Sequence, residues 1–169
     1  MLRAVLCLAA ALAACGHDGG GGAGDDAPGP DASLPVPAGC ITETSAGDHV
    51  FTCGGLQVDA RVPEACLAPG CGLILVLHGD TGNGLLMEGH VKLRELGQQH
   101  GYIVVAPTGP PFGQGLPGST WRSSNDATLV DLVGQVAAVF RVDPKKVHVT
   151  GFSRGGFVTW RLLCDHAGL

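Results

Sequence analysis

Five consecutive residues, Gly151-Phe-Ser-Arg-Gly155, have the form G-x-S-x-G, a pattern that can present a serine for attack on an acyl carbon. The β-branched run Val147-His-Val-Thr150 precedes them and an apolar helix is expected from about Arg154, so Ser153 falls at a strand-to-helix turn. A serine that projects its hydroxyl above a sheet has a strained backbone, and the two flanking glycines leave room for it. The pattern therefore predicts that Ser153 is a nucleophile and that the N–H of Arg154 faces the developing oxyanion. Because the chain holds 28 glycines, the alternative is a glycine-rich turn with an incidental serine.

The elements that would position this turn alternate in type along the chain. The first two strands alternate apolar and polar side chains around Gly54-Gly55, which predicts a β-hairpin with a primed two-residue turn. Later strands are continuous apolar runs, typical of parallel strands covered on both faces, and the segments between them carry apolar residues at helical spacing. The expected strands are 49–53, 56–62, 73–77, 102–106 and 147–150, and the expected helices are 85–100, 127–140 and one that begins near 154.

This order predicts an α/β fold with a leading β-hairpin and a parallel β-α-β-α-β-α arrangement that ends after the helix following Ser153. In such sheets function gathers at the carboxyl ends of the strands, where His78, Thr108 and Ser153 are expected. The loop from Thr108 to about Ser119 is rich in glycine and proline, and loops of this kind are more often functional or mobile than packed.

The first 15 residues are expected to be an export signal. Arg3 precedes the apolar run 4–12, which is too short for a stable membrane span. The stretch ends in Leu12-Ala-Ala-Cys15, which resembles a bacterial lipobox, so Cys15 is expected to carry a lipid that anchors the protein to a membrane. An ordinary signal peptide with an incidental cysteine is the alternative.

Residues 16–39 predict a disordered tether ahead of a domain over 40–169. The tether contains Gly19-Gly-Gly-Gly22 and several prolines, and it cannot bury enough apolar surface to offset the entropy of ordering. Signal and tether together predict an exported protein, either a lipoprotein of the cell envelope, in the periplasm or at the outer membrane, or a secreted protein.

The composition excludes one class of partner and indicates disulfides. The net charge of −5 offers no basic stripe for a phosphate backbone, so nucleic acid is not an expected partner. Cysteines of an exported chain are interpreted first as disulfides, and their spacing lacks the C-x-x-C pairs of a structural zinc site, so no metal is expected. We predict Cys40–Cys53 and Cys66–Cys71, although four cysteines allow three pairings. Cys164 is then either a buried thiol on a helix or has its partner in sequence that this chain lacks.

Several of these segments resemble one family. The resemblance is carried by Leu77-His-Gly79 after a buried strand, Trp121 in the following loop, Arg141 to Gly156 around the serine, and Trp160 to Cys164. These segments look like the secreted esterases grouped with polyhydroxybutyrate depolymerases and feruloyl or acetylxylan esterases. The resemblance spans roughly residues 58–164 and implies an incomplete α/β-hydrolase fold. It also implies hydrolysis of polymer or plant-derived esters, such as polyhydroxyalkanoate, feruloyl or acetyl esters, without a cofactor.

The resemblance implies roles for further residues, while the nucleophile and the amide after it keep the roles given above. The loop opened by His78-Gly79 would supply the second N–H of an oxyanion hole, from Asp80 or Thr81. His78 itself resembles a structural member of that loop rather than a general base. Trp121 would line an acyl or aromatic pocket, and a core tryptophan is an equal alternative.

No proton acceptor for the serine is expected in this chain. In α/β-hydrolases the acid and the histidine follow the serine, and here only Asp165 and His166 do so. Both fall on the helix that begins at the serine, where about twelve residues at 1.5 Å each place His166 roughly 18 Å away. The chain alone is therefore expected to be weakly active or inactive. Three interpretations stay open: a fragment or truncated product of an active esterase, a lipid-anchored binding protein that lost the base (a pseudoenzyme), and a structural exported domain.

Overall fold

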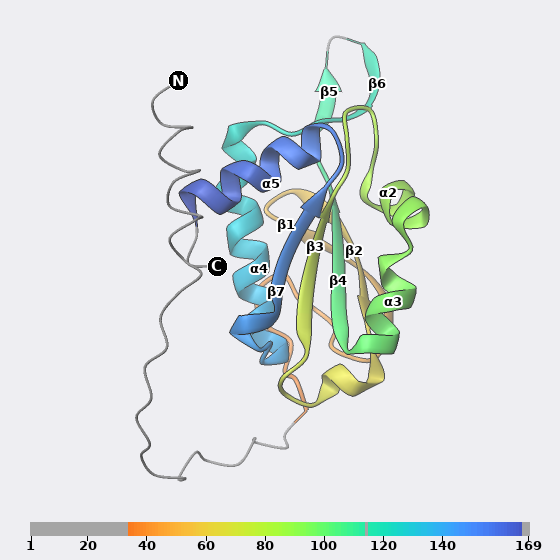
Figure 1. The fold of residues 1–169 in the computed structure, drawn as a ribbon, viewed down its shortest axis with the longest axis vertical. Helices are drawn as coiled ribbons and strands as arrows, with labels where there is room; N and C mark the ends of the chain where they lie inside the picture. The colour runs from red at the N-terminus through yellow and green to blue at the C-terminus, as the bar shows by residue number, and fades with distance from the viewer. Residues whose placement is uncertain (1–33, 114, 167–169) are drawn as a thin grey trace, which may run out of the picture. The chain divides into compact units, whose positions relative to one another are not determined.

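A five-stranded sheet lies at the centre of the fold. The structure is a computed structural model that describes residues 34–113 and 115–166. Within these residues the sheet has the order β1-β2-β4-β3-β7 (Figure 1). β1 and β2 pair antiparallel, β2 pairs antiparallel with β4, and β3 runs parallel to both β4 and β7. The strands are β1 (Gly47–Cys53), β2 (Leu56–Val62), β3 (Gly72–Leu77), β4 (Tyr102–Thr108) and β7 (Val147–Gly151).

The leading hairpin is confirmed together with its turn. β1 and β2 are joined by Gly54 and Gly55, whose φ angles are 55° and 80°. Two positive φ angles are what a type I′ turn requires, and glycine adopts them without steric strain. The parallel strands β3, β4 and β7 are confirmed as well, so the carboxyl ends of all three meet at one edge of the sheet.

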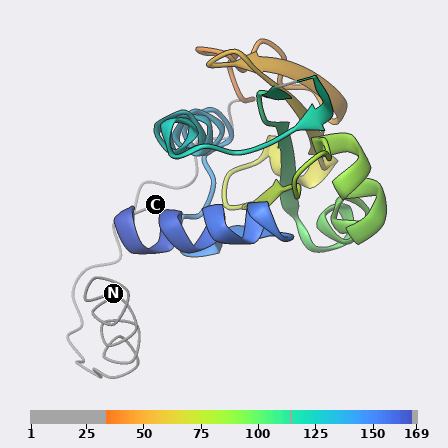
Figure 2. The same cartoon turned by 90° about the horizontal axis from the view of Figure 1, so that it is seen from above.

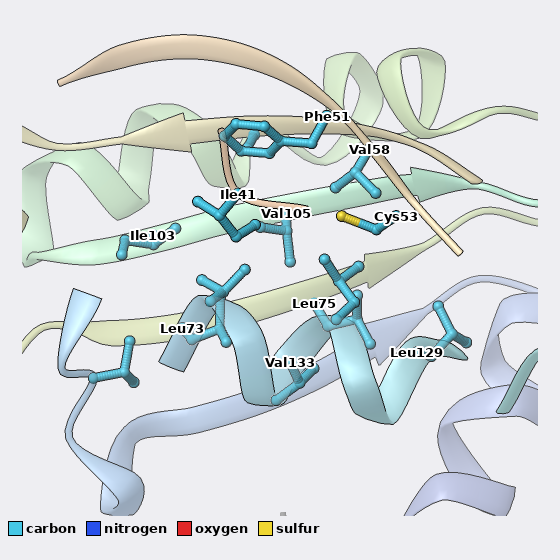
Figure 3. Packing of buried hydrophobic residues seen from close by; sticks show 14 of the residues in the cluster. Ile41, Phe51, Cys53, Val58, Leu73, Leu75, Ile103, Val105, Leu129 and Val133 are labelled. Carbon is cyan, nitrogen blue, oxygen red and sulfur yellow. The ribbon is translucent and has the colours of Figure 1, made fainter. Parts of the chain in front are cut away.

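Helices cover both faces of the sheet. α4 and α5 lie on one face, and α2 and α3 lie on the other (Figures 1 and 2). Side chains alternate along β3, so Leu73 and Leu75 join the main apolar cluster with α4 (Figure 3), whereas Val76 packs with Met87 and Leu93 on the opposite face. The helices are α2 (Gly84–Val91), α3 (Leu93–His100), α4 (Asp126–Phe140) and α5 (Arg154–Asp165), with three short 3-10 helices, η1 (Glu64–Leu67), η2 (Ser123–Asn125) and η3 (Pro144–Lys146).

An ion pair fixes α5 against α4. Nε and Nη2 of Arg161 each donate to a carboxylate oxygen of Asp126 at 2.7 Å, and this hydrogen bonding raises the pKa of Arg161. A bidentate pair of this kind restrains orientation as well as distance. The helix that follows Ser153 is therefore held at a side chain two turns beyond its start.

The prediction of one helix over 85–100 is wrong. α2 and α3 meet at Lys92, whose φ is 55°, a left-handed conformation that ends the first helix. The side chain of Glu88 is buried, and its Oε1 accepts the N–H of Arg94 at 2.6 Å, which caps the start of α3. Burial raises the pKa of Glu88. The buried Glu88 side chain thus stabilises the break between α2 and α3.

The glycine- and proline-rich loop after β4 contains a small hairpin that the sequence did not predict. β5 (Pro111–Gly113) pairs antiparallel with β6 (Leu116–Ser119). An isolated bridge connects Gly82 to Ser119 at the end of β6. Through this bridge the hairpin contacts the loop after β3, where the candidate site lies.

Both predicted disulfides are confirmed. Cys40 bonds to Cys53, and Cys66 bonds to Cys71, with Cα separations of 5.2 and 5.3 Å. Cys164 is exposed on α5, so the alternative of a buried thiol is wrong.

The predicted export signal, the candidate lipidation site Cys15 and the tether up to residue 33 lie outside the described residues. Residues 34–39, which the sequence assigns to the tether, are described. Pro35 is buried there, and its carbonyl accepts the hydroxyl of Thr44 at 2.9 Å. Across residues 34–113 and 115–166, no helix has the combined length and apolarity needed to cross a bilayer.

Two surfaces, the outer edge of β7 and an apolar part of α5, are uncovered within the described residues. Across the described ranges, β7 pairs with β3 alone and so forms one edge of the sheet. On α5, the large apolar side chains Phe157, Trp160 and Leu163 are all exposed. An unpaired strand edge and an apolar helix face are surfaces that folded proteins normally cover.

Candidate active site

Ser153 lies at the turn between β7 and α5, as the G-x-S-x-G pattern predicts. Its backbone has φ 51° and ψ −116°, a combination that is strained for a residue with a Cβ atom. The side chain is exposed, and its hydroxyl makes no hydrogen bond to any residue of the described ranges. A strained backbone conformation thus holds this hydroxyl, without a partner in the described residues, above the carboxyl ends of the parallel strands.

The flanking glycines are required by sterics. A Cβ atom at Gly151 would overlap the backbone of Gly155, and a Cβ atom at Gly155 would overlap the carbonyl group of Leu77. That carbonyl cannot move freely, because it accepts the N–H of Phe152 at 3.1 Å. The turn is therefore pressed against the end of β3, which fixes the height of Ser153 above the sheet.

The loop after β3 lies directly against this turn. A Cβ atom built on Gly79 would be 3.3 Å from Cβ of Ser153 and 3.2 Å from Cδ1 of Phe152. Residues far apart in the sequence are thus brought into contact, as expected for a nucleophile and an oxyanion loop. The N–H of Arg154, at the first position of α5, has no acceptor within its own helix.

The structure separates the two predicted donors of this loop. The N–H of Thr81 donates to the carbonyl oxygen of Ser119 at 2.8 Å, so it is not free for a substrate. The N–H of Asp80 makes no hydrogen bond within residues 34–113 and 115–166. Thr81 is therefore corrected from a candidate donor to a structural contact, and Asp80 is the candidate that remains.

The β5–β6 hairpin and Thr120 directly after it support this loop, a contribution that the sequence did not predict. The hydroxyl of Thr120 donates to the Asp80 carboxylate. Gly118 lies so close to Thr81 that a Cβ atom there would overlap the Thr81 carbonyl group. No local signal in the sequence predicts these contacts, because they join positions about 40 residues apart.

His78 has both ring nitrogens in use. Nε2 accepts the N–H of Gly109 at 2.9 Å, so the proton is on Nδ1, which donates to the carbonyl oxygen of Gly79 at 2.7 Å. The side chain is buried, and this burial lowers the pKa of His78. His78 therefore joins the loop after β3 to the loop after β4, and neither nitrogen is available to take a proton from Ser153.

Trp121 is completely buried beneath this loop. Its Nε1 donates to the carbonyl oxygen of His78 at 2.9 Å, and the two rings lie 4.8 Å apart. The carbonyl oxygen of Trp121 accepts Nε of Arg154 at 3.0 Å. The indole has no exposed surface for a substrate to contact, so its position agrees with the alternative of a core tryptophan.

A hollow of about 420 Å³ opens beside the site. It lies between the loop after β3 and α2, and Phe152 borders it next to the serine. Its apolar lining side chains are Leu86, Met87, Val91 and Phe152.

Asp165 and His166, the acid and the histidine that follow Ser153, lie at the other end of α5. The helix runs unbroken from Arg154 to Asp165, and His166 caps it. At 1.5 Å per residue, this separates His166 from the serine by about 18 Å along the axis.

Across residues 34–113 and 115–166, no three His, Cys, Asp or Glu side chains gather in a way that could hold a metal ion.

The fold and the serine turn define the class. A hairpin that leads into parallel strands, with helices on both faces and a strained serine between strand and helix, forms part of an α/β-hydrolase fold. No protein-family model matches the chain.

Comparison with known proteins gives esterases. The chain is 31% identical over 104 residues to a bifunctional acetylxylan esterase/xylanase of Neocallimastix patriciarum, covering 60% of this chain and 15% of that protein. It is 31% identical over 114 residues to poly(3-hydroxyalkanoate) depolymerase C of Paucimonas lemoignei, covering 63% of this chain and 27% of that protein. Among solved structures, the acetyl xylan esterase from Aspergillus awamori matches with a TM-score of 0.58 and 25% identity over 68% of this chain and 45% of that one. The chain thus spans less than half the length of each.

Proposed function

We propose that this chain carries the nucleophile and the oxyanion hole of a serine-dependent carboxylic ester hydrolase. The observation that carries the proposal is the strained, exposed Ser153 packed against Gly79. The N–H groups of Asp80, which follows Gly79, and of Arg154, which follows Ser153, have no hydrogen-bond partner within the described residues. A glycine-rich turn with an incidental serine would not need this strain or the second loop. The relatives are enzymes by name, which does not favour a non-catalytic binding protein.

In the proposed reaction, Oγ of Ser153 attacks the ester carbonyl carbon. The carbonyl oxygen becomes an oxyanion that accepts the N–H groups of Asp80 and Arg154. The bond to the alcohol then breaks and leaves an acyl group on Ser153, which water removes. Each oxyanion donor of this kind typically contributes about 2.7–4 kcal/mol to transition-state stabilisation. No cofactor is needed for these steps.

The attacking hydroxyl must lose its proton, and within residues 34–113 and 115–166 no side chain accepts it. His78 is neutral with both nitrogens occupied, and His166 lies at the far end of α5. We therefore propose that the general base and its acid partner are not contributed by these residues. Turnover by this chain alone is expected to be slow.

The substrate class is proposed from the relatives. Their names give acetylxylan and poly(3-hydroxyalkanoate), so acetyl and polyhydroxyalkanoate esters, polymeric or plant-derived, are the candidates. Feruloyl esters are proposed from the sequence resemblance alone. Export is proposed from the N-terminal signal and is supported by two disulfides, which persist in oxidising compartments. Lipid attachment at Cys15 would place the protein at the cell envelope. If Cys15 carries a lipid, the protein should be labelled by palmitate in a bacterial host, and Cys15→Ala should abolish this labelling. Labelling that persists in the variant would rule the anchor out.

Acylation by 4-nitrophenyl acetate tests the enzymatic proposal. We expect the full chain to release 4-nitrophenol and to gain one acetyl group, found by mass spectrometry on the peptide that contains Ser153. Ser153→Ala should abolish both signals, whereas Ser124→Ala, at another exposed serine, should leave them unchanged. Equal acetylation of the wild type and Ser153→Ala would contradict the proposal.

A further inference from the structure

The helix that borders the hollow leaves most of its large apolar side chains exposed. The polar Glu88 is buried, whereas Leu85, Leu86 and Val91 are exposed. Apolar side chains of a surface helix normally face the core. α2 packs Met87 against the sheet but leaves these three side chains exposed, near the candidate active site.

Two contacts on its inner side fix the rotation of α2, and a cap fixes its start. Gly84 lies so close to β4 that a Cβ atom there would overlap the carbonyl group of Ala106. Four residues later, Glu88 accepts the N–H of Arg94. The side chain of Asn83 accepts the N–H of Leu86 at 2.8 Å and caps the helix. Leu86 lies on the opposite side of the helix from Gly84 and Glu88, and Leu86, Met87 and Val91 line the hollow.

The lining is apolar and carries little charge. Leu86, Met87, Val91 and Phe152 supply its apolar side chains. Nδ1 of His90 is hydrogen-bonded to the carbonyl oxygen of Leu86 at 2.7 Å. Two further polar side chains are also engaged: the Asp80 carboxylate with Thr120, and the His78 ring with two backbone groups. One Asp80 oxygen accepts the Thr120 hydroxyl while the carboxylate keeps its negative charge, so an anionic ligand is disfavoured, whereas an apolar group would cover surface that is otherwise wet.

The hollow is continuous with the site of attack. Phe152 borders it and directly precedes Ser153, and Gly79 borders it and contacts both residues. A group held in the hollow therefore has one end beside the position where an ester carbonyl would meet the serine.

We propose that this hollow is a binding subsite for an uncharged apolar group of the ester. The volume of about 420 Å³ lies near the lower end of the range for ligand pockets, roughly 300–1,000 Å³. The inference rests on the proposed function, because it assigns the group to the ester that Ser153 attacks. It goes beyond that function by giving α2 the role of selecting the substrate.

Two neighbouring leucines provide a matched test. Leu85 and Leu86 are 55% and 57% exposed on the same helix, but Leu86 lines the hollow and Leu85 does not. Binding of ethyl benzoate to the full chain is measured by ligand-observed NMR, with sodium benzoate as the charged counterpart. We expect ethyl benzoate to bind and benzoate to bind much more weakly. Leu86→Ser should weaken ethyl benzoate binding roughly threefold to tenfold, and Leu85→Ser should leave it unchanged.

The outcomes separate this inference from the proposed function. Equal effects of the two serine variants, or equal binding of benzoate and its ethyl ester, would overturn the subsite even if Ser153 is acylated. Leu86-dependent binding without acylation of Ser153 would overturn the proposed function and leave the subsite standing. Comparison of methyl benzoate with its isomer phenyl acetate, both in Ser153→Ala, then shows whether the ring belongs to the acyl or the alcohol half of the preferred ester.

Discussion

Two adjacent glycines on α5 should respond in opposite ways to the same substitution. At Gly155, a methyl group would overlap the backbone of Leu77 and His78, at the end of β3. At Gly156, the nearest atom to such a methyl group is the Gly151 carbonyl oxygen at 3.4 Å, an ordinary contact. Gly155→Ala and Gly156→Ala therefore each add one methyl group, the first at a crowded position and the second at an open one.

The expected magnitudes follow from these contacts. Overpacking of a rigid site typically costs about 1–3 kcal/mol. Gly155→Ala should lie at the upper end of this range, because the obstacle is backbone held by the hydrogen bond from the Phe152 N–H. Gly156→Ala should stabilise by about 0.5–1 kcal/mol, since alanine is favoured over glycine inside a helix. The two variants should thus differ by about 3 kcal/mol in the free energy of unfolding.

Urea unfolding of the full chain, followed by circular dichroism, measures this difference. The midpoint should fall for Gly155→Ala and rise slightly for Gly156→Ala. Acylation of Ser153 by 4-nitrophenyl acetate should be lost in the first variant and kept in the second, because only the first displaces the turn. Equal midpoints and equal acylation in both variants would refute the argument that Gly155 is required by sterics.

Three further predictions concern the loops around the serine. Thr120→Val removes the hydroxyl that holds the Asp80 carboxylate. This variant should acylate Ser153 more slowly with little change in the urea midpoint. An unchanged acylation rate would contradict this positioning role. Glu88→Ala should lower the free energy of unfolding by about 0.5–2 kcal/mol, because the N–H of Arg94 loses its acceptor. Glu88→Gln keeps an acceptor and avoids a buried charge, so this variant should be at least as stable as the wild type at pH 7. Burial lowers the pKa of His78 in the folded protein, so below about pH 6.5 the unfolded chain binds this proton before the folded protein does. The free energy of unfolding should therefore decrease as the pH is lowered, by at most about 1.4 kcal/mol per pH unit. The last measurement is best made in Glu88→Gln, where the opposing effect of a raised carboxyl pKa is absent, and stability that is level or rising from pH 7.5 to 5.5 would contradict it.

The parts of the site that depend on neighbouring residues could be predicted from the sequence. The serine turn needs glycine at two fixed positions, and the pattern records both. The leading hairpin is specified in the same way, by two glycines that can adopt positive φ angles. The disulfides followed from spacing and export, although the pairing was one of three possibilities.

The parts that depend on distant contacts could not be predicted. Whether Asp80 or Thr81 donates to an oxyanion is decided by Ser119, which takes the Thr81 N–H from a strand that the sequence did not reveal. The rotation of α2 is decided by Gly84 and Glu88, whose inward positions the sequence did not predict. In both cases a single long-range or capping hydrogen bond outweighs the local pattern.

The most direct test of the account is the site of reaction with a fluorophosphonate, determined by peptide mass spectrometry of the full chain. Because the Ser153 hydroxyl lacks a proton acceptor within the described residues, the reaction is run with and without added imidazole as an external base. The account predicts one adduct, on Ser153, that forms faster with imidazole and is absent from Ser153→Ala. An unmodified Ser153 under both conditions, or adducts spread equally over the other exposed serines, would contradict the claim that this hydroxyl is built to attack acyl carbon.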